Sequence, residues 1–166
     1  VIGGGDGCCG LFINTIERAA IAADGSLGPF TNVASMTTNH ASPAVTVSGR
    51  FLYAIGGASA STVFSKVVER APINPDGSIG SFTAVSPLIT ARQGHSAAMI
   101  GRFLYVFGGA SSPSVLTNVE RAEIAPDGSL GAFAAVPNVT LTTPRGYHAV
   151  AVIGSAIYML GGQTTD

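Results

Sequence analysis

Short apolar runs that end in glycine recur along this chain. The run Phe103–Phe107 is almost continuously aromatic and β-branched and is closed by Gly108-Gly109, and the segment His95–Ile100 before it is small and apolar. The next segment, Asn118–Ile124, alternates, and Asp127-Gly128 then supplies a pair that favours a tight hairpin turn. No window shows a sustained apolar period of 3.6 residues. The pattern therefore predicts an all-β chain of short strands with essentially no helix.

The same pattern occurs three times. The dipeptide Glu-Arg recurs at spacings of 52 and then 51 residues, as Glu17-Arg18, Glu69-Arg70 and Glu120-Arg121. Asp-Gly-Ser recurs with the same spacing, and the blocks 49–57, 101–109 and 154–162 each end in Gly-Gly. A period of about 50 residues is typical of a repeat architecture. We divide the single repeat region 1–166 into units of approximately 1–36, 37–88, 89–140 and 141–166, of which the first and last are partial and complementary.

Each unit is expected to form four short strands, with Gly-Gly at the end of the second strand. A tyrosine stands three places before each Gly-Gly (Tyr53, Tyr105, Tyr158), and a phenylalanine recurs downstream of each Glu-Arg (Phe30, Phe82, Phe133). These features resemble the kelch repeat, although the phenylalanines stand where kelch units usually carry tryptophan and the chain has no tryptophan. The resemblance implies kelch-type β-propeller blades, with three four-stranded repeats that form part of a larger or oligomer-completed propeller.

The partial units at the two ends affect the expected assembly. The first unit is expected to supply third and fourth strands, and the last to supply first and second strands. Propellers normally contain about four to eight blades, so three blades would leave sheet faces and edges open. We therefore expect further propeller blades in a longer polypeptide, or a second copy of the chain, to complete the ring.

Most charged residues, and two of the three histidines, occupy repeated positions, which favours a structural role. The expected framework residues are Glu17, Arg18, Glu69, Arg70, Glu120, Arg121, Arg92, His95, Arg145 and His148. We expect Glu69 and Glu120 to be buried and hydrogen-bonded, with Arg92 or Arg145 among their partners, because a paired Glu and Arg can bridge neighbouring blades. His95 and His148 are expected to be buried and bonded to backbone, whereas His40 is expected to be exposed.

These positions do not predict an active site. No spacing brings two carboxylates together for acid–base chemistry, and the chain lacks a recognisable three-ligand metal cluster. The sequence therefore predicts no catalytic residue, no metal and no cofactor.

The segments after each Gly-Gly differ most between the units, and binding sites commonly lie on such loops of a repeated scaffold. They span 5–15, 58–66 and 110–117, and the candidate binding residues in them are Asp6, Cys8, Cys9, Phe12 and Phe64. Cys8-Cys9 occurs in one unit only. The two cysteines can be plain loop residues, a strained vicinal disulfide at a binding loop, or bridges to other sequence. The ligand class, protein or carbohydrate, stays open.

The composition limits the kinds of partner and the location that we expect for this chain. The net charge is −1, only 10% of the residues are charged and a single lysine is present, which argues against nucleic acid as a partner. No run approaches the roughly 18 apolar residues that a transmembrane helix needs. The scarcity of lysine and the many Ser and Thr favour an extracellular or cell-surface location. We therefore expect a non-catalytic extracellular binding or structural scaffold that acts through the loops after each Gly-Gly. The alternative is part of a kelch-like enzyme, an oxidase or sugar isomerase, with active-site residues partly outside this chain.

Overall fold

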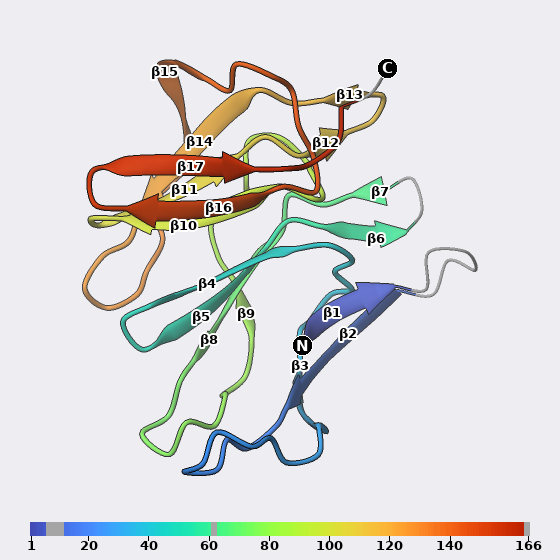
Figure 1. Ribbon diagram of the computed structural model, residues 1–166, viewed down its shortest axis with the longest axis vertical. Helices are drawn as coiled ribbons and strands as arrows, with labels where there is room; N and C mark the ends of the chain where they lie inside the picture. Colours follow the sequence, from blue (N-terminus) through green and yellow to red (C-terminus); the bar gives the residue numbers. More distant parts are fainter. Residues whose placement is uncertain (6–11, 61–62, 165–166) are drawn as a thin grey trace.

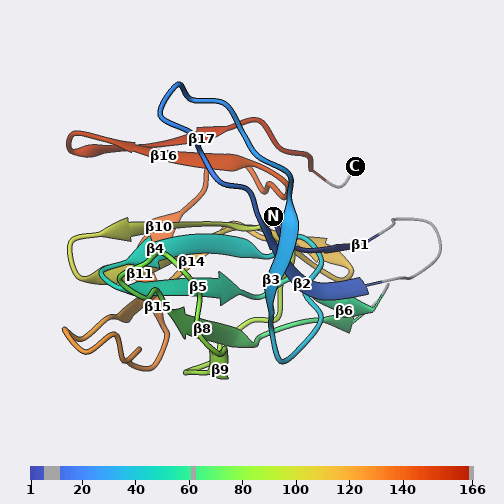
Figure 2. The ribbon, with the colours of Figure 1, turned by 90° about the horizontal axis from the view of Figure 1, so that it is seen from below.

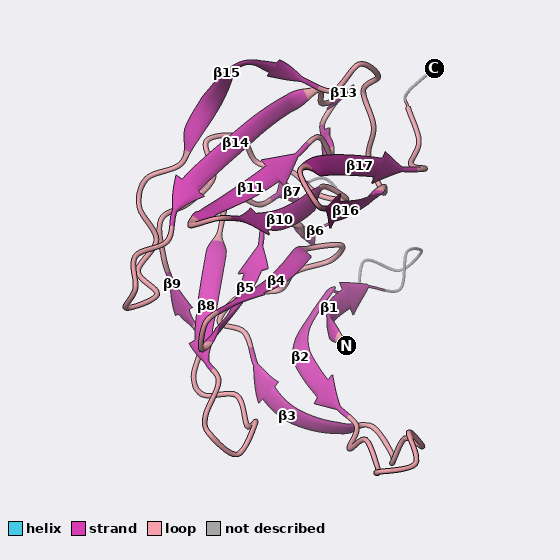
Figure 3. Ribbon diagram, turned by 60° about the vertical axis from the view of Figure 1, so that its left-hand side comes forward, coloured by secondary structure: helices cyan, strands magenta, loops and turns pink. Residues whose placement is uncertain are grey.

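The computed structural model describes residues 1–5, 12–60 and 63–164, and all of the regular structure in these ranges is β (Figure 3). Four antiparallel sheets follow one another along the chain. Sheet 1 contains β1 (Ile2–Gly5), β2 (Phe12–Arg18) and β3 (Thr31–Ser35). Sheet 2 contains β4 (Ala44–Ser48), β5 (Phe51–Ile55), β8 (Val68–Pro72) and β9 (Thr83–Ala84). Sheet 3 contains β10 (Ser96–Ile100), β11 (Phe103–Phe107), β14 (Asn118–Glu123) and β15 (Ala134–Thr140), and sheet 4 contains β16 (Ala149–Ile153) and β17 (Ala156–Leu160). The expected all-β class is confirmed.

Sheet 1 begins with the end of a second strand, because Ile2 of β1 pairs with Ile16 of β2. One expectation about the strands is wrong. The segments after Gly-Gly are more than loops: β6 (Ala58–Ala60) pairs with β7 (Val63–Phe64), and β12 (Ala110–Ser111) pairs with β13 (Ser114–Val115). The alternation of these segments is too short to be distinguished from loop sequence.

Each sheet packs against the next one along the chain. The first strands of sheets 2, 3 and 4 (β4, β10 and β16) lie next to one another, and the hairpins β6–β7 and β12–β13 project from the same end of sheets 2 and 3 (Figure 1, Figure 2). The register repeats from sheet to sheet. Glu69 lies opposite Ala54 in sheet 2, and Glu120 lies opposite Val106 in sheet 3. Residues of equivalent sequence position are therefore also equivalent in space.

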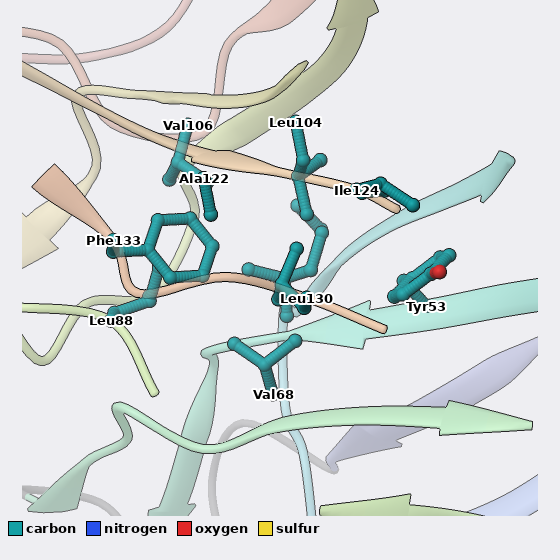
Figure 4. Packing of buried hydrophobic residues seen from close by; sticks show 11 residues of the cluster. Tyr53, Val68, Leu88, Leu104, Val106, Ala122, Ile124, Leu130 and Phe133 are labelled. Carbon is teal, nitrogen blue, oxygen red and sulfur yellow. The ribbon is translucent and has the colours of Figure 1, made fainter. Parts of the chain in front are cut away.

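The core lies between the sheets. The largest cluster joins sheets 2 and 3, where Tyr53 and Val68 face Leu104 and Leu130 (Figure 4). Phe82 and Phe133, at the recurring phenylalanine position, are only 5% and 8% exposed. The two further clusters join sheet 1 to sheet 2 and sheet 3 to sheet 4. Burial of apolar area in these three interfaces is the main favourable term in folding.

The outer faces of the first and last sheets are open among the described residues. Phe30 of the first unit is 54% exposed, although its counterparts in the next two units are buried. In sheet 4, Tyr158 and Leu160 of β17 are 50% and 54% exposed, and β17 pairs with β16 alone. No helix in the described ranges is long and apolar enough to cross a membrane.

Candidate functional site

The glutamate of each complete sheet binds the segment that leads into that sheet. We call the residues 36–43, 85–95 and 141–148, which precede β4, β10 and β16, the lead-in segments. Glu120 of β14 is 1% exposed, and its carboxylate accepts the backbone N–H groups of Ile89 (2.8 Å) and Thr90 (3.1 Å). The same carboxylate accepts a hydrogen bond from the guanidinium of Arg92, which also donates to the carbonyl of Gly108 at 2.7 Å. The carboxylate and the guanidinium thus neutralise each other without contact with water.

Sheet 2 builds the same joint with a histidine in place of the arginine. Glu69 accepts the backbone N–H groups of Thr37 (2.7 Å) and Thr38 (3.0 Å), and its Oε1 lies 3.1 Å from His40 Nε2. The other ring nitrogen of His40 bonds the carbonyl of Gly56, the counterpart of Gly108. His40 is completely buried, so the expectation that it is exposed is wrong. The shorter imidazole spans the same carboxylate and carbonyl that Arg92 spans in sheet 3.

The environment of Glu69 favours its ionised form. Burial alone would raise the pKa of this carboxyl, but hydrogen bonds from the Thr38 hydroxyl, the Thr37 amide and His40 hold the pKa below its usual value. The carboxylate is therefore charged at neutral pH. Burial of Glu69 and Glu120 is thus confirmed, and Arg92 is confirmed as a partner of Glu120.

The side chain of the arginine that follows each glutamate lies on the opposite face of the strand. Successive residues of a strand face opposite sides, and Arg70 reaches from sheet 2 to the carbonyl of Asp127 in sheet 3 at 3.4 Å. Arg18 makes the same 3.4 Å contact from sheet 1 to the carbonyl of Gly77 in sheet 2. Arg121 instead donates to the hydroxyl of Tyr105 at 3.0 Å. The Glu and Arg of one dipeptide therefore do not pair with each other; Arg18 and Arg70 reach the next sheet, whereas Arg121 bonds within its own sheet.

Glu17 and Arg145 lack some of the contacts that their counterparts in the complete sheets make among the described residues, and we call them half-engaged. Glu17 is exposed, and no described residue donates a hydrogen bond to its carboxylate. Arg145 donates to the carbonyl of Gly161 at 2.9 Å, as Arg92 does to Gly108, but no described carboxylate lies at the place that Glu120 occupies beside Arg92.

The histidines at the start of the first strands are buried, which confirms that part of the expectation. His148 Nε2 lies 2.8 Å from the hydroxyl of Ser96 on the neighbouring sheet. Neither ring nitrogen of His95 has a partner among the described residues, because Ala44 stands where the next unit has Ser96. Burial, reinforced by the charge of nearby Arg92, lowers the pKa of His95 to about 3. His95 is therefore neutral at physiological pH.

This arrangement does not make a nucleophile. Ser96 and His148 resemble a hydroxyl–base pair, but both are less than a tenth exposed, and Nδ1 of His148 lacks an orienting partner among the described residues. Burial and the charge of Arg145 lower the pKa of His148. The described ranges also contain no group of three or more His, Cys, Asp or Glu that is placed to hold a metal. The chemistry of these groups is that of a buried polar framework.

The candidate binding residues lie on or beside the hairpins. Asp6, Cys8 and Cys9 fall outside the described residues. Phe12 begins β2, which lies against β6, and Phe64 belongs to β7; both side chains are half-buried. The structure therefore brings these two aromatic residues to neighbouring elements but presents neither as a fully exposed ring.

The hairpins are tied down at their bases. Ala58 forms a β-bridge with Ala41 of the lead-in segment, and the N–H of Gly57 donates to the carbonyl of Arg92 in the next lead-in segment at 2.8 Å. Gly57 has φ +97°, and a Cβ there would lie 2.6 Å from the carbonyl oxygen of Ala41. Only glycine allows this approach. Ala110 of β12 forms the corresponding bridge with Gln93.

Sequence reasoning did not select Tyr147 as a binding residue. It stands in a lead-in segment at the position of Ser42 and Gly94, has φ +54° and is 47% exposed. The replacement of serine and glycine by an aromatic residue at a repeated position is a signal that alignment of the units contains. Its left-handed backbone is visible only in the structure.

The chain matches no protein-family model. It is 34% identical over 96 residues to the tRNA wybutosine-synthesizing protein 2/3/4 of Arabidopsis thaliana, a match that covers 57% of this chain and 9% of that protein. Among solved structures it is similar to YjhT, a kelch-like β-propeller protein, with a TM-score of 0.64 and 16% identity over 78% of this chain and 36% of YjhT. The chain thus spans about a third of the YjhT chain and about a tenth of the curated relative. The likeness to YjhT and the four antiparallel sheets show a fold of the β-propeller type.

Proposed function

We propose that this chain forms kelch-type blades of a propeller that serves as a non-catalytic binding or structural scaffold outside the cell, and that it engages a partner through the hairpins β6–β7 and β12–β13. The observation that carries the proposal is that repeated and variable residues occupy different places in each unit. The repeated polar residues, Glu69 and Glu120 above all, are buried in the joints between sheets. The segments that differ between units project from one end of the sheets (Figure 1).

The physical character of the hairpins supports a protein partner. Bridges to the lead-in segments and the Gly-Gly hydrogen bonds hold both hairpin bases, so little conformational entropy is lost when a partner binds. Val63 of β7 is 51% exposed, and Ser114 of β13 is also exposed. A pre-ordered surface of mixed apolar and hydroxyl groups suits a protein interface with few charges.

Site-specific photo-crosslinking tests the hairpin surface. A benzophenone amino acid is placed at Val63 or Ser114, and in a matched control at Ser81, an exposed residue before β9. The labelled chains are irradiated with secreted and surface proteins of the source organism. We expect one crosslinked species from the two hairpin positions, suppressed by excess unlabelled chain and absent from the Ser81 control. Equal crosslinking from Ser81, or no competed species from either hairpin, contradicts the proposal.

We also propose that the open faces of sheets 1 and 4 are covered by further propeller blades or by a second copy of the chain. The exposed apolar residues of β17 and the half-engaged Arg145 and Glu17 support this proposal. Sedimentation of the 166-residue chain distinguishes the two arrangements. Dimers that are weakened by Glu17→Arg or by Arg145→Glu, and restored when the two variants are mixed, indicate a second copy. Aggregates that do not respond to these charge reversals indicate further blades, and a cooperative monomer at micromolar concentration contradicts both.

A further inference from the structure

The backbone of Tyr147 adopts a conformation that aromatic residues rarely take. Its φ is +54°, in the left-handed region, and the equivalent residues Ser42 and Gly94 have φ values of +48° and +58°. Each unit thus places one left-handed residue just before its first strand. The N–H of Gly94 donates to the carbonyl of Ser42 at 3.1 Å, and the N–H of Tyr147 donates to the carbonyl of Gly94. The three residues form a hydrogen-bonded row that crosses sheets 2, 3 and 4.

The row does not require a tyrosine. Gly94 donates the same backbone bond as Tyr147, to the carbonyl of Ser42, and glycine adopts a positive φ without steric conflict. A bulky side chain is unfavourable in this region, so Tyr147 holds backbone strain that its own hydrogen bond does not explain. Strain of this kind, maintained by a well-packed framework, is most often found where a side chain serves a function.

The ring of Tyr147 is held in place but remains accessible. It rests on Gly94, where an added Cβ would lie only 2.8 to 3.0 Å from three ring atoms. The residue is nevertheless 47% exposed. An aromatic ring that is fixed on one side and open to solvent on the other can bind a ligand with little loss of conformational freedom.

The side chains at and beside this row are largely uncharged. Ser42 in the row is exposed, Gln93 precedes Gly94 in the chain and is half-buried, and Gln163, whose backbone bridges to Gly146 before Tyr147, is exposed. The nearest cation along the chain, Arg145, is directed to the carbonyl of Gly161. Neutral hydroxyl and amide side chains along the row that ends in an accessible aromatic ring suit a ligand that has an apolar face and neutral hydroxyl groups, rather than an ion.

We propose that Tyr147 is a stacking platform for a neutral pyranose ring, which makes the row of Ser42, Gly94 and Tyr147 a carbohydrate-binding site. The C–H groups on one face of the sugar lie on the phenol ring, and the sugar hydroxyls exchange hydrogen bonds with the neighbouring amide and hydroxyl groups. This site is separate from the hairpin surface proposed above. Its failure would leave the protein-binding proposal intact, and the converse also holds.

The absence of tryptophan from the chain gives a direct assay. Tyr147→Trp introduces a single tryptophan at the platform, and its emission is followed during titration with methyl β-glucopyranoside, methyl β-galactopyranoside and methyl α-mannopyranoside. We expect a saturable change with at least one of these sugars. Calorimetry of the unmodified chain should give binding to the same sugar, and Tyr147→Gly should weaken it about tenfold, the loss expected for one aromatic stack.

Stability measurements separate this role from a structural one. Tyr147→Gly relieves the left-handed strain, so its Tm should equal or exceed that of the parent chain while its affinity for the sugar falls. Gly94→Ala, which displaces the ring, should also weaken binding. Tyr158→Ser changes another half-exposed tyrosine, on β17, and should leave binding unchanged. The proposal is overturned if the unmodified chain binds none of the three sugars, if Tyr147→Gly retains full affinity, or if N-acetyl-tyrosine amide binds at Tyr147→Trp and the sugars do not.

Discussion

Removal of the Glu120 carboxylate should destabilise the protein far more than removal of its counterpart Glu17. In Glu120→Ala, the N–H groups of Ile89 and Thr90 lose their acceptor, and Arg92 loses its counterion while it remains fully buried. The guanidinium keeps its bond to the Gly108 carbonyl, but that neutral group does not compensate the charge. The variant therefore leaves a cation and two amide donors without partners in the interior.

The magnitude follows from this loss. Breaking a buried ion pair by removal of one partner costs about 3–5 kcal/mol. For a chain of this length each kcal/mol lowers Tm by roughly 2–4 °C, so we expect a fall of about 6–20 °C. Glu17→Ala removes an exposed carboxylate with no described partner and should cost less than about 1 kcal/mol. Because the two residues occupy equivalent positions, the comparison isolates the effect of the joint.

Calorimetric melts of both variants, with urea titrations to confirm the free energies of unfolding, check this prediction. Arg92→Met in the Glu120→Ala background removes the unpaired cation and should recover part of the loss, which identifies the buried charge as the cause. A shift of about one degree or less for Glu120→Ala, or equal shifts for the two glutamates, refutes the reasoning.

Three further predictions concern the buried histidines and metal content. Ala44→Ser supplies His95 with the hydroxyl that Ser96 supplies to His148, and should raise the free energy of unfolding by about 1 kcal/mol. Ser96→Ala should lower it by about 1–3 kcal/mol. Thermal melts that show the opposite signs refute the equivalence of the two positions. Because the folded-state pKa of His95, about 3, lies below its ordinary value of 6.5, the unfolded chain binds the proton first. Stability should therefore be complete above pH 6.5 and fall by up to about 1.4 kcal/mol per unit as the pH drops below it, and a His95→Leu variant with an equally steep decline would contradict this cause. Elemental analysis of the purified chain should find no stoichiometric copper or zinc, and a bound metal that survives dialysis would contradict the expectation.

Local pattern was sufficient to predict the main strands of each unit, although not the short hairpins after Gly-Gly. The apolar run of β11, the Gly-Gly pairs and the Asp-Gly turns are short-range features, and each has a steric or hydrogen-bonding cause within a few residues. Repetition carried the prediction further, since an ionisable residue that recurs in every apolar strand indicates a shared buried partner. In this way the burial of Glu69 and Glu120 and the role of Arg92 were predictable.

The identity of most partners was decided only by the tertiary structure. Arg92 and Glu120 are 28 residues apart, and Ser96 and His148 are 52 apart on different sheets. Their meeting depends on how each sheet packs against the next, which strand periodicity does not encode. For the same reason His40 is buried in the place of an arginine, and His95 lacks the serine partner that His148 has, since Ala44 is the counterpart of Ser96.

The sequence by itself determined the all-β class, the repeat and the main strands of each unit, because these depend on backbone sterics and side-chain alternation along one segment. Only the tertiary structure decided which repeated residues are equivalent in environment. Glu17 and Glu120 occupy equivalent positions in the repeat but differ in burial. A lead-in segment covers Glu120, whereas no described segment covers Glu17. The left-handed backbone of Tyr147, whose N–H donates to the carbonyl of Gly94 on the neighbouring sheet, likewise appears only in the tertiary structure. Local sequence determines which side chains a strand carries on each face, and the packing of the sheets determines which residues those side chains contact.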